Sequence, residues 1–208
     1  MEEPSDYRIK NVDQLRAIIG EPSKIVGLKV LKALDETSAE FIRQSPFLIL
    51  STADAEGNQD ASPKGDAPGF VLIEDEHSLC IPDRKGNKLI FGLQNILINP
   101  HVGLIFMVPG TNETLRVNGT AELTADPQLL ERLAARNAPA VLAIRVTIHE
   151  CFFHCAKAFI RSSLWRPENW PAKIKISFGK YLASKIGGDE EMARKIDEAV
   201  DFDYKHNL

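Results

Sequence analysis

The residues best suited to chemistry lie in one short stretch, LCIPDRKGNKLI, at residues 79–90. An apolar strand pattern ends at Asp83, and Arg84, Lys85 and Lys88 follow just before a helical pattern begins. A helix N-terminus offers free backbone N–H groups and partial positive charge, so cations placed there favour a bound anion. Arginine can hold two oxyanion oxygens with its planar fork, and lysine adds a point charge. The stretch predicts an anion site at Arg84 and Lys85, with a solvated basic turn as the alternative.

A second stretch, DASPKGDAPGFV at residues 60–71, holds another cation where a strand pattern runs into a loop. Its backbone could present N–H and C=O groups to the edge of a planar ligand. The residues concerned are Ser62, Pro63, Lys64 and Gly65. Taken alone, an ordinary Pro/Gly loop is the simpler interpretation.

A third stretch, FHCAKAFIRSSLWRP at residues 153–167, places Trp165 in a segment with Lys157, Arg161 and Arg166. A tryptophan near cations suits stacking on an aromatic ligand together with contact to its phosphate. An amphipathic segment docked on the rest of the domain is the simpler interpretation of this stretch by itself.

The segment HECFFHC, residues 149–155, has four metal-capable side chains in close succession: His149, Cys151, His154 and Cys155. Zinc needs four ligands that converge tetrahedrally. The segment has strand character, so we expect residues 149, 151, 153 and 155 on one face and His154 on the other. Consecutive strand residues do not close around one ion, so we predict buried thiols, a histidine that caps the strand end, and no metal site.

Bulk properties exclude several classes of function. The net charge of the 208 residues is −4, which argues against nonspecific nucleic-acid binding. No stretch approaches the roughly 20 apolar residues of a membrane span, and the polar start MEEPSDYRIK is no secretory signal. We therefore expect a cytoplasmic protein with no membrane partner and with its three cysteines reduced. Dinucleotide, P-loop and nucleophile-elbow motifs do not occur.

The elements that must position these stretches follow from periodicity. Helical patterns cover residues 12–19 and 30–42, and the tail from about residue 177 is also helical. A further helix ends at Asn99 and has one apolar face, formed by Leu89, Leu93, Ile96 and Leu97. Strand patterns at 47–64 and 69–82 form two hairpins, and residues 101–108, 114–124 and 140–154 supply longer strands. We predict a mainly β protein with flanking helices (α+β), an antiparallel barrel of six strands. Its parts are a helical extension (1–46), a barrel domain (47–167) and a helical tail (168–208) packed on that domain.

Taken together, the three stretches resemble the pyridoxamine 5′-phosphate oxidase-like family of FMN-binding split-barrel flavoproteins. The resemblance runs from about Phe47 to Pro167. It is carried by six segments in order: SPFLILST, DASPKGDAPGFV, IPDRKGNKL, NILINPHVGLIFMVPG, ETLRVNGTAEL and FHCAKAFIRSSLW.

The resemblance implies a split barrel that forms a homodimer with FMN at the subunit interface. It assigns the FMN phosphate to Arg84 and Lys85 with Asn87 close by. Because an acid beside a phosphate would repel it, we expect Asp83 to orient Arg84 or to accept from the ribityl hydroxyls. Residues 62–65 would lie along the flavin ring. Lys157, Arg161 and Trp165 would approach the flavin of the other subunit.

The sequence departs from pyridoxamine phosphate oxidases in two places. Asp83 stands where they have a serine, and their C-terminal substrate-binding arginine–histidine signature is not recognisable. We therefore expect an FMN-dependent oxidoreductase acting on an unassigned small-molecule redox substrate, with no acid or base named. The alternatives are a non-catalytic FMN-binding, redox-sensing or storage protein, and a barrel that binds another flavin-like or haem ligand.

Overall fold

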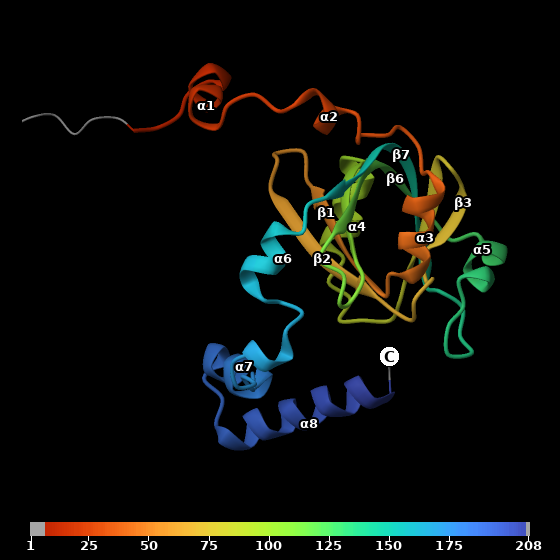
Figure 1. The fold of residues 1–208 in the computed structure, drawn as a ribbon. Coiled ribbons are helices and arrows are strands. Elements are labelled where there is room, and N and C mark those ends of the chain that lie inside the picture. Colours follow the sequence, from red (N-terminus) through yellow and green to blue (C-terminus); the bar gives the residue numbers. More distant parts are fainter. Residues whose placement is uncertain (1–6, 207–208) are drawn as a thin grey trace, which may run out of the picture.

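The computed structural model describes residues 7–206; residues 1–6 and 207–208 of the predicted end segments lie outside the described part. One sheet has the strand order β2-β1-β5-β6-β7-β4-β3, and every strand pair is antiparallel. The sheet curls into an open, split barrel (Figure 1). The predicted antiparallel split-barrel fold is confirmed, but across residues 7–206 the sheet has seven strands and not six. The strands are β1 (Phe47–Ala53), β2 (Gln59–Gly65), β3 (Leu72–Asp75), β4 (Ser78–Asp83), β5 (His101–Met107), β6 (Thr114–Thr124) and β7 (Leu142–His154).

Both predicted hairpins are present. The turn between β1 and β2 is held by Asp54, whose carboxylate accepts from the backbone N–H groups of Glu56 and Asn58. Gly57 takes the positive φ of 84° that this turn requires. The second hairpin joins β3 to β4, and because β3 has four residues and pairs only with β4, it forms one edge of the sheet.

The barrel interior follows from period-2 alternation on the strands. On β6, Leu115, Val117, Gly119 and Ala121 are buried, while the alternate residues between them are partly exposed. They meet inward-facing side chains of the neighbouring strands, among them Phe106 and Ile144, which are fully buried. This cluster is the main core of the domain.

Helices cover the barrel at three places. They include α3 (Glu36–Gln44) against β6 and β7, α4 (Phe91–Ile98) against β1, β2 and β6, and α5 (Pro127–Arg132) against β7. Asp126 caps α5, with its carboxylate accepting from the Gln128 N–H and Pro127 in the first turn. The predicted apolar face of α4 is only partly buried: Ile96 is buried, whereas Leu97 is 74% exposed.

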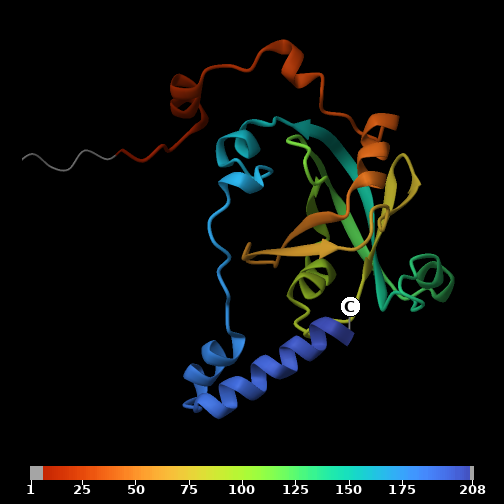
Figure 2. The same cartoon turned by 60° about the horizontal axis from the view of Figure 1, so that its bottom comes forward.

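The predicted helix over residues 30–42 is wrong in its first half. Leu31 exchanges two backbone hydrogen bonds with Cys151 on β7, at 2.9 and 2.8 Å, which adds this segment to the sheet edge. The helix α3 starts later because Asp35 caps it by accepting from the Ser38 N–H. Before Leu31 the chain carries α1 (Val12–Ile19) and α2 (Lys24–Gly27), which extend away from the barrel (Figures 1 and 2).

The C-terminal region begins with α6 (Lys157–Ser162) and a 3-10 turn at Pro167–Asn169. An extended segment then leads to α7 (Phe178–Ile186) and α8 (Glu190–His206), which pack on each other. This helical pair is set apart from the barrel in both views (Figures 1 and 2). Within residues 7–206, no helix combines the length and the apolar character needed to cross a membrane.

Candidate functional site

The site is centred where β2, at one edge of the sheet, meets the end of β4. Lys64 Nζ lies 2.6 Å from Asp83 Oδ1, and both side chains are only about one-fifth exposed, at 19% and 20%. β2 alternates so that Asp60, Ser62 and Lys64 are half-buried while Pro63 and its other neighbours are exposed. The strand therefore presents a row of polar side chains toward the inside of the split.

Arg84 follows Asp83 and lies beside this pair in a second ionic cluster. Its Nε donates to Asp66 Oδ2 at 3.0 Å, and its Nη1 donates to the Leu133 carbonyl at 2.8 Å. Asp66 is only 5% exposed and also lies 3.3 Å from Arg136. Arg84 thus links the loop after β2 to the loop after α5. Its third guanidinium nitrogen, Nη2, makes no hydrogen bond within residues 7–206. The residue that orients Arg84 is Asp66, whereas Asp83 is engaged by Lys64.

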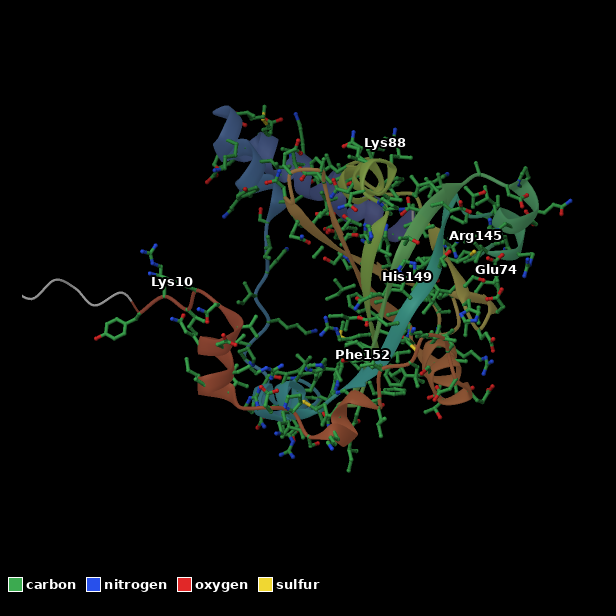
Figure 3. All side chains as sticks on the ribbon, turned by 90° about the horizontal axis from the view of Figure 1, so that it is seen from above. Lys10, Glu74, Lys88, Arg145, His149 and Phe152 are labelled. Carbon is green, nitrogen blue, oxygen red and sulfur yellow. The ribbon has the colours of Figure 1, made fainter. Side chains whose placement is uncertain are left out.

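The loop between β4 and α4 carries the remaining cations. Lys85, Asn87 and Lys88 are exposed, and Lys88 lies at the rim of the molecule beside α4 (Figure 3). The Asn87 side chain accepts from the Leu89 N–H at 2.9 Å, which shapes the loop. The helix α4 begins at Phe91, so these cations lie in the loop that leads into it.

The start of α4 lies against the polar row of β2. A Cβ placed on Gly92 would come within 3.2 Å of Asp60 Oδ2 and 3.9 Å of Ser62 Oγ, so only glycine allows this approach without adjustment. One turn later, Asn95 donates to Thr52 Oγ1 at 3.0 Å. The helix N-terminus has no side-chain cap, so no capping side chain satisfies its first backbone N–H groups.

A cavity of about 490 Å³ adjoins the Arg84 cluster. Its walls are the loop after β2 and the end of α5, with Arg84, Arg43, Arg132 and Asp66 among the lining side chains. Arg43 is paired with Glu36 at 2.8 Å. The cavity is therefore lined by more positive than negative charge, next to the residues predicted to bind phosphate.

The C-terminal candidates lie in a different part of the chain. Lys157 and Arg161 are exposed on α6. Trp165 donates its indole N–H to the Thr111 carbonyl at 2.8 Å, and its ring stacks on Phe159 with centroids 5.8 Å apart. No contact within residues 7–206 joins these side chains to Lys64, Asp83 or Arg84. A shared site would need a second copy of the chain.

The HECFFHC segment has a different geometry from the one predicted. The β6–β7 register shifts between Asn118 and Gly119, where Glu150 and Ile148 are the partners and His149 is the extra residue. His149 consequently lies outside, 3.4 Å from Thr120 Oγ1, while Cys151 is buried and donates to the Ala33 carbonyl. The prediction that positions 149 and 151 share a face was wrong. In the described part of the chain no three His, Cys, Asp or Glu side chains are grouped to hold a metal.

Four residues of the site were missed by sequence reasoning: Thr52, Asp60, Asp66 and Asn95. Asp60 could have been found, because it lies two and four residues before Ser62 and Lys64 on a strand, and residues at that spacing share a face. The other three contact the site through tertiary packing, for which no local sequence pattern exists.

Comparisons with known proteins agree with this architecture. The family model described as pyridoxamine 5′-phosphate oxidase matches residues 34–155. A sequence search of curated proteins found no match.

Several solved structures resemble part of the chain. A Lactobacillus delbrueckii protein named for pyridoxamine 5′-phosphate oxidase is 26% identical, with 59% of this chain and 95% of that chain covered and a TM-score of 0.46. HupZ of Group A Streptococcus is 17% identical, with coverages of 58% and 93% and a TM-score of 0.47. An FMN-binding protein of Syntrophomonas wolfei is 9% identical, with coverages of 57% and 89% and a TM-score of 0.43. Because the family model spans more than half of the residues, including all seven strands, the chain belongs to the pyridoxamine 5′-phosphate oxidase family.

Proposed function

We propose that the protein binds FMN in the split between β2 and β4 and acts as an FMN-dependent oxidoreductase. The observation that carries the proposal is the meeting of the polar face of β2 with the basic loop after β4, through Lys64 and Asp83. Family membership makes a flavin the appropriate ligand class. FMN, when bound, supplies the redox chemistry by accepting and donating a hydride.

The residues fit a ligand with a phosphate at one end and a planar polar ring at the other. Lys85 and Lys88 are exposed cations on one loop, and Arg84 keeps Nη2 available beside them. Ser62 and the Lys64–Asp83 pair supply polar groups along β2. The chain thus places charge for a phosphate and hydrogen-bonding groups for a ring edge within one continuous region.

Homodimer formation is part of the proposal. Lys157, Arg161 and Trp165 do not meet the β2–β4 region of their own chain, and the family resemblance assigns them to the flavin of the other subunit. The cytoplasmic location and the small-molecule substrate expected from the sequence stay predictions.

A non-catalytic role as an FMN-binding, sensing or storage protein is the second candidate. It is favoured by the engagement of both carboxylates near the anion site: Asp83 is bonded to Lys64, and Asp66 to two arginines. Neither is available to transfer protons without breaking an ion pair.

Two measurements test these functions in sequence. The visible spectrum of the purified protein, before and after addition of FMN, tests binding: a colourless protein that takes up no FMN would refute both functions. Steady-state assays with a reduced nicotinamide and an electron acceptor then separate them. Turnover supports the oxidoreductase, and bound FMN that no donor reduces supports the non-catalytic role.

A further inference from the structure

The cavity of about 490 Å³ beside Arg84 lies between two apolar clusters. Phe70 and Ile73, which pack against the main core, line one part of it, and Leu72 and Leu133, which pack in a second cluster beneath α5, line another. In Figure 1, α5 lies beside β3 at the edge of the barrel. The volume is in the range of small-molecule sites, whose walls are mostly apolar with a few polar groups. The cavity therefore suits a small ligand with an apolar body.

The loop after β2 gives the cavity a preformed wall. The Phe70 N–H donates to the Ala67 carbonyl at 3.1 Å, which closes a tight turn over Pro68 and Gly69. Gly69 has a φ of 82°, the sign that the third position of a type II turn requires, and proline is favoured just before it. Because residues of the turn itself fix its shape, this wall is in place before any ligand binds.

Arg84 is held at the cavity by the groups that orient it. Its Nε donates to Asp66, and its Nη1 donates to the Leu133 carbonyl. The Asp66 side chain is almost fully buried, and it binds Arg84, Arg136 and the Ala67 N–H. One carboxylate thus faces two guanidinium groups, so this cluster carries an excess of one positive charge beside the cavity.

Arg132, at the end of α5, adds a second positive charge. Its side chain lines the cavity and makes no hydrogen bond or ion pair in the part of the chain that the structure describes. Its charge acts on Glu74, but that carboxylate is bonded to Arg145 at 2.8 Å. Arg43 also lines the cavity and is already paired with Glu36. Arg132 is therefore the lining cation that is available to a ligand.

We propose that this cavity binds a small carboxylate with an apolar body, at a site separate from the FMN site. The carboxylate pairs with Arg132, because a guanidinium group matches a carboxylate in charge and planar geometry. The excess charge of the Asp66 cluster adds attraction, and Phe70 and Leu72 contact the apolar body. Arg132 distinguishes the two sites, because it lies at the end of α5 and not on the loop after β4.

Fluorine NMR of the full chain tests this site with para-trifluoromethylbenzoate as the probe. Broadening of the probe signal gives its Kd, and para-trifluoromethylbenzyl alcohol is the neutral probe of similar shape. The carboxylate should bind at least about tenfold more tightly than the alcohol, the effect of one charge-assisted hydrogen bond. Arg132→Gln should weaken binding of the carboxylate about tenfold and leave the alcohol unchanged. The matched control is Arg194→Gln, on the exposed side of α8, which should bind both probes like the natural chain.

A second pair of variants locates the probe on the chain. Ala134 lines the cavity just after α5, and Ala138 lies on the same loop but does not line it. Ala134→Trp should fill the cavity and abolish binding of both probes, whereas Ala138→Trp should keep it. Thermal unfolding of the two variants checks that both remain folded.

Three results would overturn the proposal: equal affinities for the two probes, an unchanged carboxylate affinity in Arg132→Gln, or unchanged binding in folded Ala134→Trp. The carboxylate titration is then repeated at saturating FMN, where the probe should bind together with FMN. Complete displacement of the probe would show instead that the cavity receives the FMN phosphate. If the protein takes up no FMN, the probe titrations still decide this proposal, so the two proposals fail separately.

Discussion

Lys64 and Asp83 form an ion pair at 2.6 Å although four strands separate β2 from β4 in the sheet order. The contact exists because the sheet curls until its first strand approaches its sixth, and no backbone ladder joins the two. A side-chain pair thus spans the split of the barrel at the position where we propose that FMN binds. Its removal should affect both the stability of the barrel and the binding of the ligand.

Lys64→Ala should lower the free energy of unfolding by about 2 kcal/mol, because it leaves the largely buried carboxylate of Asp83 without its charge-assisted hydrogen bond. Chemical denaturation of the full chain measures the change. Lys64→Ala with Asp83→Ala completes a double-mutant cycle, and we expect the double variant to be more stable than the sum of the single effects predicts. Additive single effects would show that the pair does not hold the split together.

Lys85→Ala should weaken FMN binding by about 1.5–3 kcal/mol, the range of a charge-assisted hydrogen bond, with little change in stability, because Lys85 is exposed on its loop. Arg84→Ala should weaken FMN binding by a similar amount. It should also lower stability, because Asp66 would lose one of its two arginine partners and keep Arg136 and the Ala67 N–H.

Fluorescence titration with FMN and thermal unfolding measure the two effects in parallel. Asp66→Asn is the matched control for the structural part of the Arg84 effect. Unchanged FMN affinity in both Lys85→Ala and Arg84→Ala would show that this loop is only a basic turn.

The three thiols should differ in reactivity. Burial raises the pKa of the Cys80 thiol to about 12, and burial also raises the pKa of Cys151. A thiol titrating far above the working pH has little thiolate, so both should resist a thiol reagent at pH 8. Cys155 is exposed. We expect one thiol to react quickly in the folded protein and all three to react after denaturation, with the number of modified thiols measured by absorbance. Rapid modification of a thiol in the folded Cys155→Ser variant would contradict this.

Local signals explain why much of the fold was predictable. The β1–β2 hairpin follows from Asp54 and Gly57, which form its turn from residues within the turn itself. The alternation on β6 likewise reports which face is buried. These features depend on neighbours in sequence, so sequence patterns are sufficient to find them.

The failures came from contacts between distant segments. His149 leaves the predicted face because the ladder to β6 shifts at Gly119, where an added Cβ would collide with the Thr147 carbonyl. Leu31 leaves the predicted helix because β7 offers it a backbone partner in Cys151. The partner of Arg84 was missed for the same reason, since the chain brings Asp66 to it only after the barrel has formed.

Stability of the α7–α8 hairpin should depend on pH through Asp197. Hydrogen bonds from the Ser177 hydroxyl and the Gly179 N–H lower the pKa of Asp197 below its ordinary value of 3.8. A carboxyl group with a lowered folded-state pKa stabilises the fold above the unfolded value, and this contribution is lost as pH falls through the folded value. The start of α7 should therefore loosen below about pH 4, where protonation of Asp197 removes the charge that these donors bind.

Amide hydrogen exchange at Gly179, corrected for the intrinsic rate, is the direct measurement. Its protection factor should fall between pH 5 and pH 3 in the natural chain and should be lower and nearly independent of pH in Asp197→Asn. Glu198→Gln is the matched control, because Glu198 pairs with Arg194 on the exposed side of α8 and should keep the pH dependence of the natural chain. A protection factor that stays flat in the natural chain, or that falls equally in Asp197→Asn, would show that other groups hold the start of α7.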